Sequence, residues 1–480
     1  MSADPLTLAL FLPLFGAMAG FVFPRAASVI GLGAVLANGA AVVWLALKVA
    51  DAGAIGVHLG GWAPPLGIAL RADGLSTAML AMTAGVGLMV SLGALDALRE
   101  ARQRQYFWPL WLLLLTGMNG VYLGSDLFNL YVMIEVIALA AVGLTVLSGT
   151  RAALGAGLEY MYASILGALL FLMGVGLVYL QIGRLDFTGL VAAEPAGTLS
   201  AAMALMLVGL ALKSALFPLH FWLPAAHANA TAPASALLSG LVVKAALYLF
   251  LRLTGAMPLP DEIMLTLIGG FGAGAVLWGG VQALRAERLK LLVAWSTVVQ
   301  IGLMFIALAS AGPLGLHESW KPAAILIMAH GVAKAGMFLA AGRIRAEIGH
   351  DRIADLDRAA TRPALAQFAF ALAAVSIIGL PPSLGFIGKW SLMEGALAAG
   401  NWHWVAVTMT GTLLAVAYFS RVFAAFLRFD RMQGAAQEHP RRALADLAPL
   451  TLALAAVSLG LMAAPILSFI DLGYPPGGAP

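Results

Sequence analysis

Two lysines, Lys213 and Lys244, lie deep inside stretches of sequence that otherwise have the character of membrane helices. The apolar run LSAAMALMLVGLAL precedes Lys213, and AALYLFL follows Lys244. A charge near the centre of a bilayer costs at least ~2.5–3.5 kcal/mol on insertion scales, so an ionisable residue there predicts a functional site with a partner group. At 1.5 Å per residue, Lys213 lies roughly 20 Å from the start of its segment near Leu199, in a hydrocarbon layer about 30 Å thick. This depth disfavours the alternative, in which the lysine side chains extend to the membrane surface.

Two prolines and two histidines lie between these lysines. Pro218 and Pro224 each remove a backbone donor, which predicts that the helix breaks into two halves. Broken helices at membrane depth line polar cavities, and transporters use them for ion sites. His220 and His227 are seven residues apart, which predicts that they share one face of the second half, and histidine suits a proton relay because it titrates near physiological pH. Hydrogen bonding to carbonyls freed by the break is the alternative role for either histidine.

Other ionisable residues also fall within apolar segments. Glu135 lies about eight residues into its segment, in FNLYVMIEVIALAAVGL, and needs a cationic partner because burial drives an unpaired carboxylate neutral. His330 and Lys334 are four residues apart and therefore share one helix face. Lys389 follows a second proline break, in GLPPSLGFIGKW, and Glu394 lies near enough along the chain to neutralise it in part.

A further segment, RLKLLVAWSTVVQIG, carries small polar groups into an apolar helix. These groups belong to Ser296, Thr297 and Gln300. Hydroxyls that bond back to the carbonyls of their own helix are the commoner explanation for such residues. A role in a chain of water molecules that conducts protons is the alternative.

The stretch FPLHFWLPAAHANATAPASALLSG resembles the signature of the antiporter-like subunits that Mrp-type cation/proton antiporters, respiratory complex I and the membrane-bound hydrogenases share. The match is long and specific. It departs from the commonest form at Ala226, where many members carry Asp. The loop HLGGWAPPLGIALRADGLS also resembles this family, and it favours the D-type subunit of the Mrp antiporters.

The resemblance implies roles for the residues that match the family pattern. A Glu on the fifth segment pairs with a Lys on the seventh, which here are Glu135 and Lys213. The family places a histidine on the eleventh segment that relays protons between two halves, and a lysine follows it by four residues; these positions hold His330 and Lys334. The family uses Lys or Glu on the twelfth segment, at the position of Lys389.

The function that the resemblance implies is proton translocation by a subunit of a multi-subunit Mrp-type Na⁺/H⁺ antiporter, which works with other subunits and exchanges H⁺ for Na⁺. Loosening of the Glu135–Lys213 pair would release a proton, which would pass to Lys244 and then through His330 to Lys389. The alternative is a proton-pumping membrane subunit of a redox complex, either an NADH:quinone oxidoreductase or a membrane-bound hydrogenase, whose electron chemistry belongs to partner chains. A solute carrier that works alone is a third option. It is disfavoured because members of the family work as subunits of larger complexes.

The composition agrees with a membrane protein and excludes several kinds of chemistry. Hydrophobic residues make up 61% of the chain, charged residues make up 10%, and the mean hydropathy is +0.94. The absence of cysteine excludes disulfides and cysteine-ligated iron–sulfur clusters. Neither H-E-x-x-H nor G-x-x-x-x-G-K-[ST] occurs, so we expect no cofactor, no metal site and no nucleic-acid partner. The first apolar stretch lacks a basic leader and a cleavage site, so we expect a retained helix and not a signal peptide.

Windows of about 20 apolar residues predict an all-α polytopic membrane protein. The fourteen expected segments, of which 199–230 and 364–398 are discontinuous, are 5–23, 27–48, 73–95, 106–124, 127–148, 160–181, 199–230, 233–252, 263–284, 290–311, 321–342, 364–398, 403–427 and 447–470. The resemblance implies two inverted repeats of five helices, at 106–252 and 253–427. N-terminal helices and an outer Gly/Pro-rich loop occupy 1–105, and an inner loop and a C-terminal helix occupy 428–480.

The distribution of basic residues predicts how the chain lies in the membrane. Lys and Arg predominate in the loops that face the cytoplasm if both termini lie outside, as the positive-inside rule requires. We therefore expect a multi-pass protein of the bacterial inner membrane with both termini on the outer face. The Gly/Pro-rich loop from Asp51 to Asp73 is expected to form an extended or hairpin cover on that face.

Overall fold

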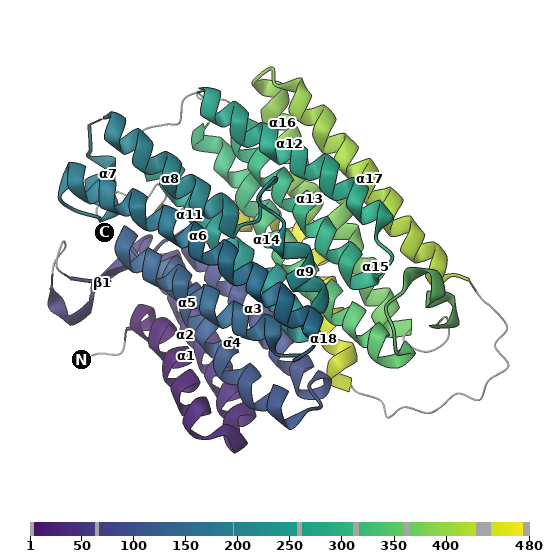
Figure 1. Ribbon diagram of the computed structural model, residues 1–480. Coiled ribbons are helices and arrows are strands. Elements are labelled where there is room, and N and C mark those ends of the chain that lie inside the picture. The colour runs from purple at the N-terminus through teal and green to yellow at the C-terminus, as the bar shows by residue number, and fades with distance from the viewer. Residues whose placement is uncertain are drawn as a thin grey trace.

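The computed structural model is a bundle of helices with a small two-stranded hairpin at one end (Figure 1). It describes residues 4–62, 67–194, 196–256, 262–310, 316–359, 364–428 and 443–473. The α-helices within these residues are α1 (Pro5–Val22), α2 (Ala27–Ala52), α3 (Gly74–Ala97), α4 (Ala101–Leu123), α5 (Leu127–Val146), α6 (Arg151–Ile182), α7 (Phe187–Val191), α8 (Gly197–Lys213), α9 (Trp222–Asn229), α10 (Ala232–Leu237), α11 (Val243–Ala256), α12 (Glu262–Arg285), α13 (Leu289–Ser310), α14 (Leu316–Ile348), α15 (Ala364–Ile378), α16 (Leu384–Ala398), α17 (Trp402–Phe426), α18 (Ala443–Ser458) and α19 (Ala463–Ile470).

Most of these helices are long and apolar enough to cross a bilayer. The described residues contain 11 such spans, with α10–α11 and α18–α19 each counted as one. The helix α4, of 23 residues, adds a further segment that is apolar after its polar first turns, and the pairs α8–α9 and α15–α16 add two discontinuous ones. The prediction of an all-α polytopic membrane protein with fourteen segments, two of them broken, is therefore confirmed.

The two broken segments occupy the same place in two sets of five. The first set is α4, α5, α6, α8–α9 and α10–α11, and the second is α12, α13, α14, α15–α16 and α17. In each set the fourth member is interrupted. Corresponding interruptions are expected of two related repeats, although the exact limits of the repeats remain a prediction from the family resemblance.

The central helices are buried almost completely, whereas the outer helices expose apolar side chains. The most hydropathic windows of α10–α11 and of α14 are 100% buried, and that of α13 is 89% buried. In contrast, only 33% of the most hydropathic window is buried in α2 and in α17. Large apolar side chains such as Leu139, Leu180 and Leu413 face outward, as expected where lipid covers the surface. The ionisable residues of interest lie on or beside the buried core.

Glycine allows α6 and α8 to approach closely next to Lys213. A Cβ on Gly209 would lie 2.4 Å from the carbonyl oxygen of Gly167, and a Cβ on Gly167 would lie 2.9 Å from the carbonyl oxygen of Gly209. Neither position can hold a larger residue without moving a helix. Membrane helices use small residues for such contacts, because packing drives their association in lipid.

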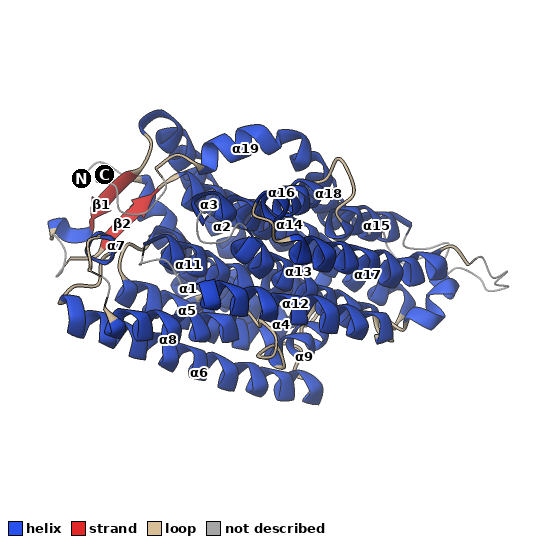
Figure 2. Cartoon of the chain, turned by 90° about the horizontal axis from the view of Figure 1, so that it is seen from above, coloured by secondary structure: helices blue, strands red, loops and turns tan. Residues whose placement is uncertain are grey.

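The loop between α2 and α3 forms the expected hairpin. Its strands are β1 (Ile55–His58) and β2 (Ala69–Ala72), which pair antiparallel with Ile55 opposite Ala72; residues 63–66 lie outside the described residues. The end of the chain closes against this hairpin, because Gly74 N–H donates to the Leu472 carbonyl at 2.7 Å and Arg71 donates to the Gly473 carbonyl at 3.1 Å. Figure 2 shows that both ends of the chain lie on the hairpin side of the bundle.

Candidate functional site

Glu135 on α5 and Lys213 on α8 form an ion pair. The Lys213 Nζ lies 3.0 Å from Glu135 Oε1 and donates a second hydrogen bond of 2.9 Å to Ser164 Oγ on α6. The Lys213 side chain is 8% exposed and that of Glu135 is 28% exposed. The pairing predicted from the sequence is therefore confirmed, and Ser164 is an additional partner that the sequence did not indicate. The opposite charges attract each other in this partly buried environment.

The first helix break fixes the position of Lys213, which is the last residue of α8. Residues 214–221 form turns, and Ala215 adopts a left-handed conformation with φ 59°. This conformation costs a residue other than glycine roughly 1–2 kcal/mol, so surrounding contacts must hold it. One such contact bridges the break, where the indole N–H of Trp222 donates to the Leu212 carbonyl at 3.0 Å.

A small cavity separates Lys213 from the helix that carries Lys244. Its volume is about 20 Å³, and its walls include Ser164, Lys213, Val242, Ala245 and Ala246. A cavity needs roughly 10–15 Å³ to hold one water molecule, which also needs polar partners. The ammonium of Lys213 and the hydroxyl of Ser164 supply such partners, so there is room for one water between the ion pair and the next segment.

Lys244 is completely buried beside a π-helical turn, η3 (Leu238–Val242). The Lys244 ammonium donates to the main-chain carbonyl of Ser239 within this turn. Turns of this kind replace i→i+4 bonding locally and often occur at functional sites. The Ser239 hydroxyl in turn lies 2.9 Å from the Thr297 hydroxyl on α13. Among the described residues, no carboxylate forms an ion pair with Lys244.

Lys334 on α14 reaches the same part of α13. Its Nζ donates to the Val293 carbonyl at 2.9 Å and to the Ser296 hydroxyl. The hydroxyls of Ser296 and Thr297 also donate to the Val293 carbonyl, at 2.9 and 3.2 Å. The expected bonding of these hydroxyls to their own helix is therefore confirmed. Both also contact polar groups on other helices, so hydrogen bonds link Ser239, whose main chain binds Lys244, with the groups that bind Lys334; we call these residues the lysine group.

His330 is buried next to this lysine group. It is 1% exposed and lies within electrostatic range of Lys244 and Lys334. Neither of its ring nitrogens has a hydrogen-bond partner in the described part of the chain. An imidazole with two available nitrogens can accept a proton at one and release a proton from the other.

His220 and His227 do not share one helix face, contrary to the prediction. The helix α9 begins at Trp222, so His220 belongs to the preceding turn, where its ring meets the edge of Trp295 at 5.6 Å. His227 lies within α9, packs against Phe338 at 5.9 Å, and is close to the lysine group. The prediction was wrong because the break continues through eight residues of turn, which a count of two prolines does not show.

Lys389 on α16 binds carbonyls that the second break leaves free. Its Nζ donates to the carbonyls of Ile377 and Ile378 at 3.1 and 2.8 Å, and to the Thr412 hydroxyl at 3.3 Å. The Gln300 side chain on α13 donates to the same Ile377 carbonyl at 3.1 Å. Sequence reasoning noted Gln300 but assigned it no role of its own, although its spacing of four residues from Ser296 places both on one face of α13.

Glu394 does not neutralise Lys389 as expected. Lys389 is 3% exposed, whereas Glu394 is exposed on the same helix, and no ion pair joins them. A residue five positions later on an α-helix points about 140° away from the first. Proximity along the chain was therefore a poor guide to proximity in space.

A second buried ion pair, which sequence reasoning missed, lies towards the hairpin end. Arg252 on α11 is 2.6 Å from Asp73 Oδ1 and also donates to the Tyr248 hydroxyl at 2.8 Å; the two charged side chains are 5% and 2% exposed. The Tyr248 hydroxyl donates to the Tyr122 carbonyl at 3.0 Å. Nothing in the sequence links position 252 with a partner 179 residues earlier.

The described residues contain no group of three or more His, Cys, Asp or Glu side chains that could hold a metal ion. The ionisable groups instead comprise the Glu135–Lys213 ion pair and four buried residues, which are Lys244, His330, Lys334 and Lys389. Such groups can bind and release protons. The hydrogen bonds described above connect several of them.

Comparison with known proteins gives relatives that are all membrane subunits of antiporter or respiratory complexes. Residues 124–415 match the family described as NADH:quinone oxidoreductase/Mrp antiporter, transmembrane region. The N-type subunit of the NADH-quinone oxidoreductase of Desulforudis audaxviator is 34% identical over 455 residues, which cover 92% of this chain and 90% of that protein. The D-type subunit of the Na⁺/H⁺ antiporter of Alkalihalophilus pseudofirmus is 30% identical over 392 residues, which cover 79% of this chain and 78% of that protein. A chain in the structure of the Mrp complex from Dietzia sp. superposes with a TM-score of 0.86 at 26% identity, over 98% of this chain and 96% of that chain.

Proposed function

Because the chain belongs to the NADH:quinone oxidoreductase/Mrp antiporter transmembrane family, we propose that it is the proton-translocating, D-type subunit of a multi-subunit Mrp-like Na⁺/H⁺ antiporter. The complex lies in the bacterial cell membrane with both ends of this chain on the outer face. The observation that carries the proposal is the Glu135–Lys213 ion pair at a helix break, next to buried lysines that lack a carboxylate partner among the described residues.

Proton transfer begins at the ion pair. While Glu135 accepts the hydrogen bond from Lys213, the lysine keeps its proton. When the pair separates, Lys213 becomes a buried cation without a counter-charge, and burial then favours release of the proton. The adjoining cavity of about 20 Å³ has room for the water that carries this proton towards Lys244.

The transfer continues to α13 and α14, in the second set of five helices. Lys244 donates to the main-chain carbonyl of Ser239, and the hydroxyls of Ser239 and Thr297 join this residue to the carbonyl that Lys334 also binds. His330, on α14, relays the proton from this group towards Lys389. Lys389 receives it at the second break, where Gln300 shares one of its carbonyl partners.

The membrane potential supplies energy for these steps when net charge crosses the membrane. One elementary charge that crosses the full potential carries about 2.3 kcal/mol per 100 mV. An amount of this order is enough to drive exchange of H⁺ for Na⁺. Other subunits of the complex supply the remaining parts of the cation pathway.

The test is Na⁺-dependent proton flux in vesicles that contain the assembled complex. Lys244→Ala leaves the Glu135–Lys213 pair in place but interrupts the route, so we expect flux to fall to background while the complex still assembles. Lys48→Ala, at an exposed lysine near the end of α2, is the matched control and should transport normally. Loss of the Lys244→Ala protein from the complex would instead mark a structural lysine, and normal flux would contradict the proposed route.

The second candidate is a proton-pumping membrane subunit of a redox complex. The 34% identity to the N-type subunit of an NADH-quinone oxidoreductase, over 92% of this chain, favours it. Both candidates use the same ionisable residues, so mutations of these residues do not distinguish the antiporter from the redox complex. The proteins that co-purify with this chain distinguish them. Flavin and iron–sulfur proteins indicate the redox complex, and small membrane subunits with Na⁺-dependent flux indicate the antiporter.

A further inference from the structure

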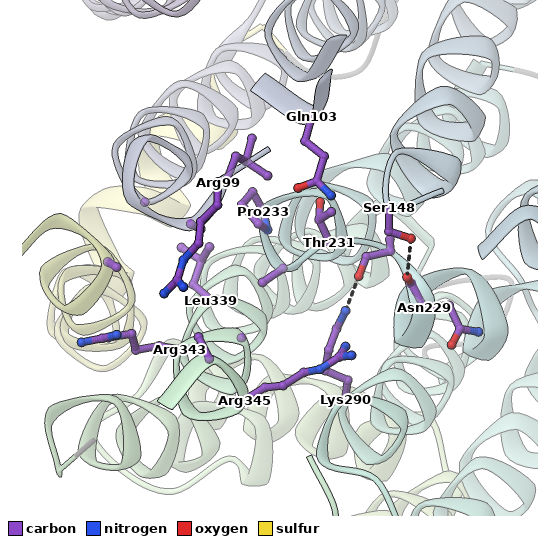
Figure 3. A pocket seen from close by; sticks show the side chains of 18 of the residues that line it. Arg99, Gln103, Ser148, Asn229, Thr231, Pro233, Lys290, Leu339, Arg343 and Arg345 are labelled. Carbon is purple, nitrogen blue, oxygen red and sulfur yellow. Dashed lines mark hydrogen bonds between the residues drawn. The ribbon is translucent and has the colours of Figure 1, made fainter. Parts of the chain in front are cut away.

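A cavity of about 520 Å³ opens at the end of the bundle opposite the hairpin. Its walls come from the ends of α3, α9 and α14 and from the starts of α4, α6, α13 and α18 (Figure 3). This volume lies within the range of roughly 300–1,000 Å³ that small-molecule sites occupy. The cavity plays no part in the proton route proposed above.

The walls of this cavity are strongly cationic. Five cationic side chains and one carboxylate line it, namely Arg99, Arg288, Lys290, Arg343, Arg345 and Asp96. Figure 3 shows Arg99, Lys290, Arg343 and Arg345 around the same space, where Arg99 lies between α3 and α4, Lys290 lies on α13 and the other two lie on α14. Such a gathering of like charges is unfavourable unless anions compensate it.

Carboxylates compensate only part of this charge. Arg288 lies 3.1 Å from Asp351, and Arg343 lies 2.7 Å from Asp446. In contrast, Arg99 and Arg345 are exposed and form no ion pair with the residues that the structure describes. Two guanidinium groups at the cavity therefore remain available to a ligand.

The inner wall adds a buried cation and an unused hydroxyl. Lys290 is 1% exposed, and its ammonium donates to the Ala230 carbonyl. A buried ammonium with a neutral acceptor alone is costly, because a carbonyl replaces only part of the lost hydration. The Thr231 hydroxyl, also in the wall, is buried without a hydrogen-bond partner among the described residues. Both groups can donate to an anion in the cavity.

We propose that this cavity binds a phosphate group, carried either by the headgroup of an anionic phospholipid or by a free phosphate anion. Guanidinium groups bind phosphate oxygens with paired hydrogen bonds, and hydroxyl and ammonium donors complete such a site. Basic pockets between membrane helices at the cytoplasmic surface bind anionic headgroups. The apolar side chains of Leu98 and Leu339 in the same wall give a lipid glycerol and its first acyl carbons a surface to contact.

The experiment measures binding to the purified, delipidated complex without any ion gradient, so its result does not depend on transport. The probes are fluorescent phosphatidylglycerol in phosphatidylcholine nanodiscs and radiolabelled inorganic phosphate. The cavity variant combines Arg99→Gln with Arg345→Gln. The control variant combines Arg25→Gln with Arg104→Gln, which removes the same charge from exposed residues outside the cavity at the same end of the bundle.

We expect the cavity variant to bind one of the probes about 30-fold more weakly than the unaltered complex, and the control variant to bind it within about twofold. Selective loss of phosphatidylglycerol binding identifies a lipid headgroup as the source, and selective loss of phosphate binding identifies a free anion. Arg99→Lys with Arg345→Lys keeps the charge and should recover part of the binding, which separates ligand contact from misfolding. Equal weakening in the cavity and control variants, or no saturable binding of either probe, would overturn the proposal.

Discussion

The hydroxyl groups of Ser239 and Thr297 lie 2.9 Å apart and join the segment that carries Lys244 to α13. Thr297 also bonds to the Val293 carbonyl, to which Lys334 donates. Two lysines on different helices are therefore connected inside the bundle through groups that lie between them. The link runs from the Ser239 main chain, which binds Lys244, through one pair of hydroxyls.

Thr297→Val removes this connection while almost preserving the volume of the side chain. We expect Na⁺-dependent proton flux to fall about tenfold or more, because the hydroxyl link between the two lysine-bearing segments is lost and the buried Ser239 hydroxyl is left without its partner. Thr410→Val, at an exposed threonine on α17, is the control. Normal flux in vesicles with Thr297→Val would show that the two lysines act independently of this link.

Glu135→Ala should abolish exchange. It leaves Lys213 as a buried, uncompensated charge, which costs about 3–5 kcal/mol, or forces the lysine neutral. Glu135→Gln keeps the shape and one hydrogen-bond acceptor, so it should assemble better but still transport poorly. The control is Glu159→Gln, at an exposed glutamate on α6. Near-normal flux in both Glu135 variants would remove the ion pair from the mechanism.

Lys389→Glu places a carboxylate opposite the carbonyls of Ile377 and Ile378, which now bind an ammonium. A carboxylate can only accept hydrogen bonds, so it must take up a proton before it can donate to either carbonyl. We expect assembly to survive, with strongly reduced transport that improves at lower pH. Lys389→Met holds no proton and should be less active still. If flux and its pH profile are unchanged in both variants, Lys389 does not lie on the proton route.

Asp186 caps the N-terminus of the short helix α7, outside the membrane-spanning segments. Its carboxylate leads us to a prediction about stability in acid. Burial raises the pKa of Asp186, but hydrogen bonds from Arg184 and from the Gly189 amide outweigh this effect and hold its pKa below the ordinary value. A carboxyl with a lowered pKa stabilises the fold above its ordinary range, and this stabilisation is lost as the pH falls through the folded-state pKa.

Asp186→Asn should therefore lower the melting temperature at neutral pH and flatten its decline in acid. The effect should be roughly 1 kcal/mol or less, because the Arg184 side chain is 43% exposed and solvent screens the pair. Thermal unfolding in detergent at several pH values measures it, with Asp51→Asn, at an exposed site on α2, as the control. If the melting temperature of Asp186→Asn declines in acid as steeply as that of the unaltered protein, the Asp186 carboxylate does not contribute to acid stability.

The positions of the segments could be predicted because their physical causes are local. Apolar runs long enough to span a bilayer fix the helices, and prolines mark the breaks near Pro218 and Pro381. The Glu135–Lys213 pair could also be predicted, because a buried carboxylate requires a cationic partner and the family resemblance identified Lys213 as that partner. The requirement for charge compensation is thus visible in a sequence even when the geometry is not.

Contacts that depend on the rotation and tilt of helices could not be predicted in this way. The sequence did not show that Ser239 meets Thr297, or that Gln300 shares a carbonyl with Lys389, because each contact joins helices whose relative rotation only packing determines. The cationic cavity combines residues near positions 99, 290 and 345, which are too far apart in the chain for any pattern to connect. His220 was misplaced for a related reason, since the length of a break depends on turns that hydropathy does not report.

The closure of the chain end over the hairpin sets an order of events during biosynthesis. Arg71 binds a carbonyl 402 residues later, so at roughly 5–20 residues per second the ribosome needs about 20–80 s to supply its partner after Arg71 has been made. During that interval the start of α3 lies uncovered, because Gly74 also waits for the carbonyl of Leu472. The hairpin end of the bundle therefore gains its contacts with Leu472 and Gly473 only in a chain that has been translated through α19.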